Sequence, residues 1–161
     1  MENIISELSK FSNEILDLGV SIKDLRVEEF ENSYSINLPN DFKKFMKKIN
    51  GFNLMGSEVY SFDKSKSESI ENVYYYEHFD VHRPQYSHLV PFCNDGRGNF
   101  YCLDTLNTIK NGDSLIVFWV SNYEYTLNDI PEIVNNNFLE WIQEVIIDWT
   151  LEDYNYDGTE K

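Results

Sequence analysis

Histidine is the commonest metal ligand in proteins and a frequent acid–base catalyst, so the three histidines of this chain come first. His78 and His82 are four residues apart, and Asp80 lies between them. At the end of a helix the two imidazoles could face the same way, and a carboxylate could complete a metal site with them. The Arg-Pro pair that follows His82 indicates an ordinary loop instead. We therefore predict that these residues hold no metal ion.

The two cysteines, Cys93 and Cys102, invite three kinds of chemistry. They do not form a C-x-x-C pair, so a structural zinc site has no framework. Both lie in apolar runs, which lack the electropositive surroundings that a nucleophilic thiolate needs. They could face each other across a hairpin, so a disulfide is geometrically conceivable. In the cytoplasm we expect two reduced thiols in the core.

The glycine-rich segment 94–99, N-D-G-R-G-N, carries no catalytic signature. It lacks the G-x-x-x-x-G-K-[ST] pattern of a phosphate loop, and a G-x-G alone says little. Carboxylates are so numerous that no pair of them stands out as a general acid and base. We predict that the chain has no catalytic residue and no cofactor, and that it is not an enzyme.

Tyrosines beside carboxylates point to binding instead. Tyrosine contributes rigid contact area and a hydroxyl group at protein interfaces. Tyr123, Glu124 and Tyr125 are therefore the first partner-binding candidates, and the alternative is that these are scattered surface side chains. Asp95 and Arg97, in the glycine-rich segment, are the second candidates. The alternative for these two is ordinary turn chemistry.

The balance of charge narrows the class of partner. The chain has 13 Lys and Arg against 28 Asp and Glu, which gives a formal net charge of −15. Such a chain repels the phosphate backbone of nucleic acids and the anionic surface of membranes. A basic protein partner would be attracted, with faster encounter at low salt. The alternative explanation of the charge is solubility alone.

Size and hydrophobicity indicate one domain over residues 1–161. The chain is 42% hydrophobic and long enough to bury a stable core. Its longest apolar stretch, 115–120, is far too short to cross a membrane. The first residues lack the apolar core of a signal peptide. We expect a cytoplasmic protein, and the sequence leaves its oligomeric state open.

The strands that must position these residues centre on 89–105. Two apolar runs flank the glycine-rich segment there, which predicts a β-hairpin. The run 114–120 is rich in β-branched and aromatic residues and predicts a strand that is covered on both faces. Alternation over 58–62 predicts another short strand, and 121–128 indicates a turn with a short edge strand.

Helices are predicted before and after these strands. Apolar spacing predicts helices over 3–18 and 21–34. The inward candidates of the second are Leu25, Val27, Phe30 and Tyr34. A third helix runs from Pro39 to a stop at Gly51, and its four lysines, the only basic patch, are interpreted as a solvated face.

Two later segments complete the pattern. Residues 68–79 fit either a helix or an extended strand, because of the run V-Y-Y-Y. Asparagines 135–137 offer N-caps for a final helix whose aromatic residues Phe138, Trp141 and Trp149 face the core. The acidic tail at 151–161 is expected to fray. Because the strands follow one another through short turns, the order predicts an α+β protein with antiparallel pairing.

Three groups of motifs, in this order and spacing, resemble the SUKH superfamily, which includes a fungal regulator of cell-wall glucan synthesis and many bacterial immunity proteins. They are L-P-N-D-F-K-K-F-M at 38–46 with N-G at 50–51, P-F-C-N-D-G-R-G-N at 91–99 with L-D at 103–104, and F-W at 118–119 with F-L-E-W-I at 138–142. Asn137 and Trp141 stand where the family often has Ser and Phe, and neither change upsets the helix. The resemblance covers about 27–147 and leaves out the first helix and the acidic tail.

The resemblance implies a central, mostly antiparallel sheet with N-terminal and C-terminal helices packed on it. It also implies binding rather than catalysis, because bacterial members typically neutralise a toxin delivered between cells, often a nuclease, by occupying it. The family lends no catalytic residues. We therefore expect an immunity protein whose partner is a protein toxin with a basic surface. The alternative is a regulatory scaffold like the fungal members.

Overall fold

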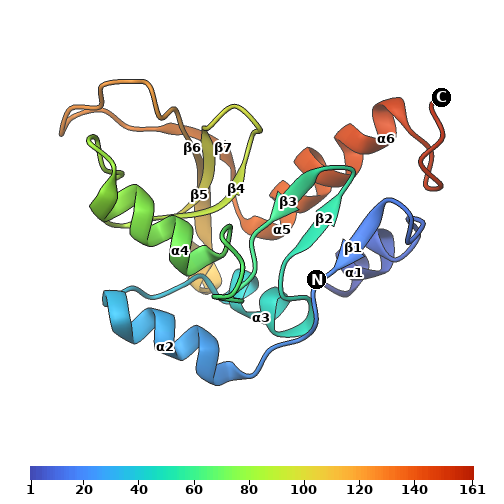
Figure 1. Cartoon of the computed structure of the whole chain (residues 1–161), viewed down its shortest axis with the longest axis horizontal. Helices are drawn as coiled ribbons and strands as arrows, with labels where there is room; N and C mark the ends of the chain where they lie inside the picture. The colour runs from blue at the N-terminus through green and yellow to red at the C-terminus, as the bar shows by residue number, and fades with distance from the viewer.

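Seven strands form one antiparallel sheet in the described part of the chain, and each pairs with its neighbour in sequence. The structure is a computed structural model that describes residues 1–23, 26–109 and 111–161. The strands are β1 (Leu16–Leu18), β2 (Phe52–Leu54), β3 (Ser57–Val59), β4 (Leu89–Asn94), β5 (Phe100–Thr108), β6 (Ser114–Trp119) and β7 (Glu132–Asn135). The antiparallel sheet and the helices around it (Figure 1) confirm the predicted α+β class.

The predicted hairpin lies at the middle of this sheet, where β4 pairs with β5 and β5 with β6. Val90 lies opposite Leu103, and a bulge interrupts the register between Pro91 and Cys93. Cys93 packs in the main core, whereas Cys102 packs in a second cluster that also holds Trp119. Both thiols are free and buried. The two cysteines therefore do not meet across the hairpin as the sequence allowed.

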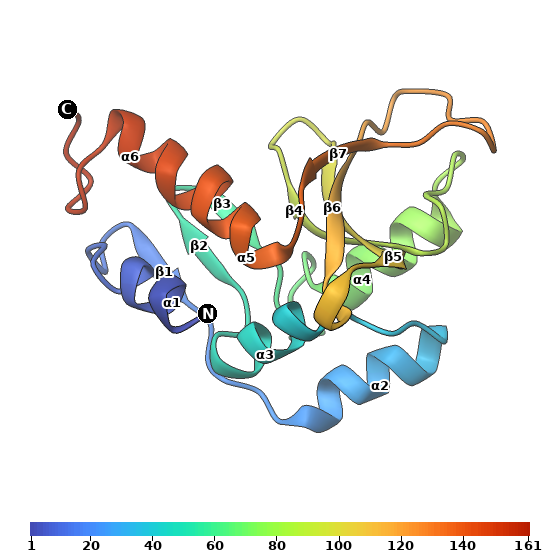
Figure 2. The same ribbon diagram turned by 180° about the vertical axis from the view of Figure 1, so that it is seen from behind.

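The helices are short, and two of those described continue into π-helical turns. They are α1 (Glu2–Leu8), α2 (Asp24–Tyr34), α3 (Asn40–Lys48), α4 (Ile70–Tyr75), α5 (Phe138–Trp141) and α6 (Trp149–Asp153), with a short 3-10 turn at Lys110–Gly112. A π-helical turn (Tyr76–Asp80) extends α4, so the segment that fitted helix or strand is helical. A second (Ile142–Asp148) joins α5 to α6, and the resulting rod lies across β2 and β3 (Figure 2).

Side chains from the sheet pack on two faces. The main core holds a cluster of edge-to-face rings in which Phe92 of β4 meets Phe138 and Trp141, with ring centroids 5.3 and 4.7 Å apart. The opposite face carries the smaller cluster, which Tyr86 and Tyr125 cover from two loops. Because β6 contributes to both clusters, the prediction of a strand covered on both faces is confirmed.

Helices α2 and α3 pack against the main core as their spacing predicted. Val27 and Phe30 are each only 1% exposed, and Tyr34 is partly buried. Leu25, the fourth inward candidate, lies outside the described residues. The basic face of α3 forms ion pairs with neighbouring helices: Lys43 Nζ lies 2.8 Å from Glu31 of α2, and Lys48 Nζ lies 2.5 Å from Glu2 of α1.

The N-terminal segment differs from its prediction. Its periodicity predicted one helix over 3–18, but α1 ends at Leu8 and residues 16–18 form β1. Leu16 pairs with Leu54 of β2 and is buried. Strand pairing at the edge of the sheet thus overrides a helical pattern, because it buries the same leucine and also satisfies backbone hydrogen bonds.

The C-terminal half holds three further differences. No strand forms at 121–128, and the edge strand is instead β7, which begins after Pro131. Trp149, predicted as core, is 57% exposed. The tail does not fray, because the backbone N–H of Ser12 donates to the carbonyl of Tyr156 at 2.8 Å and the Tyr156 ring packs on Phe11.

Candidate protein-binding groove

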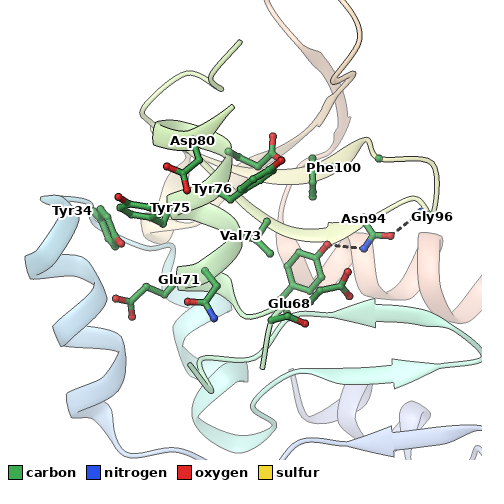
Figure 3. A pocket seen from close by; sticks show the side chains of 15 residues that line it. Tyr34, Glu68, Glu71, Val73, Tyr75, Tyr76, Asp80, Asn94, Gly96 and Phe100 are labelled. Carbon is green, nitrogen blue, oxygen red and sulfur yellow. Dashed lines mark hydrogen bonds between the residues drawn. The ribbon is translucent and has the colours of Figure 1, made fainter. Parts of the chain in front are cut away.

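A groove of about 830 Å³ runs between the helix formed by α4 with its π-helical turn and the tip of the β4–β5 hairpin. Its lining comprises Tyr34, Tyr60, Ser67, Glu68, Glu71, Asn72, Val73, Tyr75, Tyr76, Glu77, Asp80, Asn94, Gly96, Gly98 and Phe100. Figure 3 shows Val73 and Tyr76 pointing from the helix toward the hairpin, while Tyr75 points toward Tyr34 of α2. The groove is therefore open, lined by aromatic rings and spread over three elements.

The helix wall is built by a run of tyrosines that cannot all reach the core. Ser69 caps the helix, its Oγ accepting from the backbone N–H of Asn72 at 3.3 Å. Tyr74 turns inward and is 3% exposed, which leaves Tyr75 and Tyr76 half exposed on the groove side. These exposed rings supply the kind of rigid contact area that protein interfaces use.

The charged side chains that line the groove are all acidic. Four carboxylate side chains line it and no lysine, arginine or histidine does. Glu71 has an ion-pair partner, Lys64, whose Nζ lies 2.5 Å away, whereas Glu68 and Asp80 are exposed. Glu77 is only 7% exposed, and its burial raises its pKa, an effect that the nearby Gln85 amide partly offsets. The groove therefore presents negative potential beside aromatic rings.

The hairpin wall is held by side-chain amides. The Nδ2 of Asn94 donates to the Tyr60 hydroxyl at 2.7 Å, and its Oδ1 accepts from the backbone N–H of Gly96 at 2.8 Å. Asp95 accepts from the backbone N–H groups of Arg97 and Asn99 at 2.8 and 3.0 Å. Partial burial of Asp95 raises its pKa, but a hydrogen bond from the Asn99 side-chain amide and these backbone bonds outweigh that effect and lower it. Asp95 thus shapes the turn that carries the rim of the groove.

The first partner-binding candidates lie in the loop that follows β6. Tyr123 is 53% exposed. Tyr125 stacks on Trp119 with ring centroids 3.9 Å apart, and its hydroxyl accepts from the backbone N–H of Val120 at 3.1 Å. Glu124 forms an exposed ion pair with Arg83. Tyr125 therefore has a structural role as a cover for the second cluster, while Tyr123 and Glu124 remain at the surface.

The structure brings this loop next to the second candidates. The Oδ1 of Asn99, in the hairpin turn, accepts from the backbone N–H of Ser121 at 3.1 Å. A hollow of about 460 Å³ is lined by Glu77, Val81, His82, Arg83, Gly98, Phe100 and Ser121. Three of these, Glu77, Gly98 and Phe100, also line the groove. The hollow continues the groove toward the loop of Tyr123. Arg97 is exposed on the hairpin turn next to Gly98, which lines both depressions.

His78 and both cysteines occupy packed positions, whereas His82 is exposed. His78 stacks on Tyr74 with ring centroids 3.9 Å apart, and burial lowers its pKa. Burial raises the pKa of both Cys93 and Cys102, which disfavours the thiolate. Within the described residues no group of three His, Cys, Asp or Glu side chains could hold a metal ion. Over the same residues, no helix is long and apolar enough to cross a membrane.

Most residues of the groove were not predicted from the sequence, although one signal for them was present. In Y-Y-Y-E-H-F-D at 74–80, a helix can turn only one of three consecutive tyrosines fully inward. The other two must then lie exposed among Glu71, Glu77 and Asp80. That reasoning requires the helix, which the sequence left open. The opposite wall could not be inferred, because it depends on how the hairpin packs against the helix.

Comparisons with known proteins agree with this fold. A sequence model of the family described as "SUKH_5: SMI1-KNR4 cell-wall" matches residues 1–147. The match includes the first helix, which the motif resemblance left out. The chain is also similar to a solved structure described as "Crystal structure of protein from Pseudomonas syringae pv. tomato", with a TM-score of 0.63 and 17% sequence identity over 92% of this chain and 99% of that chain. At that identity the likeness concerns the fold alone.

Proposed function

We propose a function for this chain from one premise: it belongs to the SUKH superfamily, within the family described as SMI1-KNR4 cell-wall. The chain acts as an immunity-type protein that binds a cognate bacterial protein toxin and neutralises it without covalent chemistry. The groove between α4 and the β4–β5 hairpin is the contact surface, and the exposed loop around Tyr123 extends it. The partner presents a basic surface, such as the cationic cleft of a nuclease.

The observation that carries this proposal is the groove's combination of aromatic area and unopposed negative charge. Tyrosine and other aromatic side chains dominate the energetic centres of protein interfaces. Four carboxylates in a lining without basic residues select a cationic partner and disfavour an anionic one. The formal net charge of −15 adds long-range attraction toward the same partner.

Co-expression tests the proposal. The probe is the protein encoded by the reading frame next to the gene for this chain, produced in a host cell whose growth it arrests. We expect the wild-type chain to restore growth. The double variant Glu68→Lys with Asp80→Lys reverses two exposed carboxylates in the groove, so we expect it to lose protection and to bind the toxin at least tenfold more weakly.

The matched control changes the net charge equally at the other end of the molecule. Glu14→Lys with Glu152→Lys alters two exposed residues near α1 and in α6, far from α4 along the long axis (Figure 1). We expect this control to protect as the wild type does. Equal loss of protection in both variants would show that net charge acts alone, and retained protection in the groove variant would refute the assigned surface.

A second candidate function is that of a regulatory scaffold for a partner in the same cell. The observation that favours it is the cell-wall description of the matching family. In this case growth rescue from a neighbouring toxin fails, and the groove variant, but not its control, releases a basic protein of the host that copurifies with the wild-type chain.

A further inference from the structure

We infer that Glu77 is the anchor of the groove, and that it receives one arginine side chain of the protein partner. This inference rests on the proposed function, because it specifies the chemistry of the residue that the partner presents. Glu77 lies at the junction of the groove and the neighbouring hollow, together with Gly98 and Phe100. A side chain that enters from either opening reaches the same carboxylate.

The burial of Glu77 is the first observation behind this assignment. Its side chain is only 7% exposed, yet it lines two surface depressions. Among the described residues it has no ion-pair partner, in contrast to Glu71 nearby, which is paired with Lys64. A buried carboxylate without a counter-ion is costly to the free protein, and an incoming guanidinium group would supply the missing charge.

The neighbouring side chains fit arginine in particular. Tyr76 and Phe100 both line the groove, and Figure 3 shows their rings close to each other between the helix and β5. A guanidinium group is planar and stacks on aromatic rings while its N–H groups bind a carboxylate in bidentate fashion. A lysine ammonium group could neutralise Glu77 but would gain less from the rings. The rings therefore favour arginine over lysine.

The other charged groups around Glu77 are consistent with an empty cation site. Glu68, Glu71 and Asp80 in the groove add negative potential and attract the same cation. On the side of the hollow stand His82 and Arg83. Arg83 is the cation of this chain that could compete, but it is paired with Glu124 at the surface. The Gln85 amide and the Cys102 thiol also lie near Glu77, and neither carries positive charge.

Burial also raises the pKa of Glu77, which gives the site a measurable signature. An adjacent cation favours the ionised carboxylate, so occupation by arginine lowers this pKa again. A structural role for Glu77 predicts no such change on addition of an arginine compound.

The test uses the full-length chain and the small probe N-acetyl-arginine methylamide. NMR spectra are recorded during titration, together with the carboxyl ¹³C shift of Glu77. We expect saturable shifts at Glu77, Gln85 and Phe100, with the carboxyl signal moving toward its ionised position. The isosteric citrulline compound lacks the positive charge, and the Glu77→Gln variant lacks the negative charge and one of the two acceptor oxygens. In either case we expect affinity for the probe to fall at least tenfold.

The matched control is Glu152→Gln, an exposed carboxylate in α6, which should bind the probe as the wild type does. Unfolding curves of each variant establish that it is folded. Equal shifts with arginine and citrulline, or unchanged binding to Glu77→Gln, would overturn the anchor while leaving growth rescue by the wild type intact. If growth rescue fails but the NMR titration gives the expected result, the proposed toxin partner is refuted and the arginine site is retained.

Discussion

At the scale of single residues, two of the three buried carboxyl groups in the described part of the chain, Asp41 and Glu77, differ in what they contact. Asp41 is 7% exposed and accepts from the backbone N–H of Phe42 at 2.7 Å and from that of Phe138 at 2.9 Å. It therefore joins the first turn of α3 to the first turn of α5 and satisfies buried donors of both. Glu77 is equally buried, but the donor beside its carboxyl group is the Gln85 side-chain amide rather than backbone N–H groups of two helices. Its energetic cost is the signature of a group kept for binding.

The cost of Glu77 leads to a prediction about stability and pH. Because burial raises the pKa of Glu77 in the folded state, folding takes up a proton at pH values between the ordinary glutamate pKa of about 4.3 and the raised value. The folded state is therefore favoured at low pH and loses this contribution as the pH rises through the raised value. Glu77→Gln removes this loss. We therefore expect its free energy of unfolding at pH 8 to be about 1 kcal/mol higher than that of the wild type.

The measurement is the midpoint of thermal or urea unfolding at pH 4 and at pH 8. For a chain of this length 1 kcal/mol corresponds to about 2–4 °C. The gain should vanish at pH 4, where the wild-type carboxyl group is protonated. Glu152→Gln, an exposed counterpart, should show no difference at either pH. A Glu77→Gln variant that is less stable at pH 8 would mean that the carboxylate holds the fold together.

Asp41 also shows how far residue types can be interpreted without a structure. The predicted helix from Pro39 places Asp41 in its first turn, and the structure confirms that position. The bond to Phe138, a residue 97 positions away, could not be predicted, because local sequence does not encode which distant N–H group comes near. The prediction that Trp149 lies in the core is wrong for the same reason. Helical spacing places this residue on the apolar face of the helix, but it does not show whether a neighbour covers it, and Trp149 is exposed.

At the scale of elements, the two ends of the chain stabilise each other. The Tyr156 ring packs on Phe11 with centroids 4.9 Å apart, and its hydroxyl donates to the Glu7 carboxylate. The backbone N–H of Lys161 donates to the carbonyl of Asp153 at 2.9 Å, which folds the tail back on α6. The acidic composition of this tail predicted fraying. Composition reports the exposed side chains and misses the contacts that the half-buried Tyr156 makes with Phe11 and Glu7.

Removing that tyrosine should show whether the docked tail matters. We expect Tyr156→Ala to lower the free energy of unfolding by about 1–3 kcal/mol, since it loses an aromatic pair and a hydrogen bond to a charged group. Urea unfolding measures the change. Tyr154→Ala is the matched control, because Tyr154 is also half buried in the tail but meets its neighbour Glu160 through the backbone. Equal effects of the two variants would support fraying instead.

Among the elements, the middle strands were the most predictable. The hairpin and β6 combine turn residues, β-branched residues and near-continuous hydrophobicity, so several local signals agree. β1, β2 and β7 are only three or four residues long, and their local signals are correspondingly weak. They form because a neighbouring strand offers a partner. The groove could therefore be predicted only in part, because one of its walls is a predictable hairpin and the other depends on how a helix packs.

At the scale of the whole molecule, the net charge has two consequences that salt should separate. With 28 acidic against 13 basic residues, the folded chain repels itself, and expansion on unfolding relieves that repulsion. The same charge attracts a basic partner over distances longer than any contact. Screening weakens both effects, since the Debye length is about 10 Å at 0.1 M salt and about 3 Å at 1 M.

We therefore expect sodium chloride to stabilise the free protein and to slow its association with the toxin. Between 50 mM and 500 mM the thermal midpoint should rise, while the association rate constant falls at least tenfold and the dissociation rate constant changes little. Stopped-flow mixing and thermal unfolding measure the two. The Glu68→Lys and Asp80→Lys variant should retain the rise in the midpoint but show a shallower fall in rate. An association rate constant that does not depend on salt would contradict electrostatic attraction as the means by which this acidic chain finds its partner.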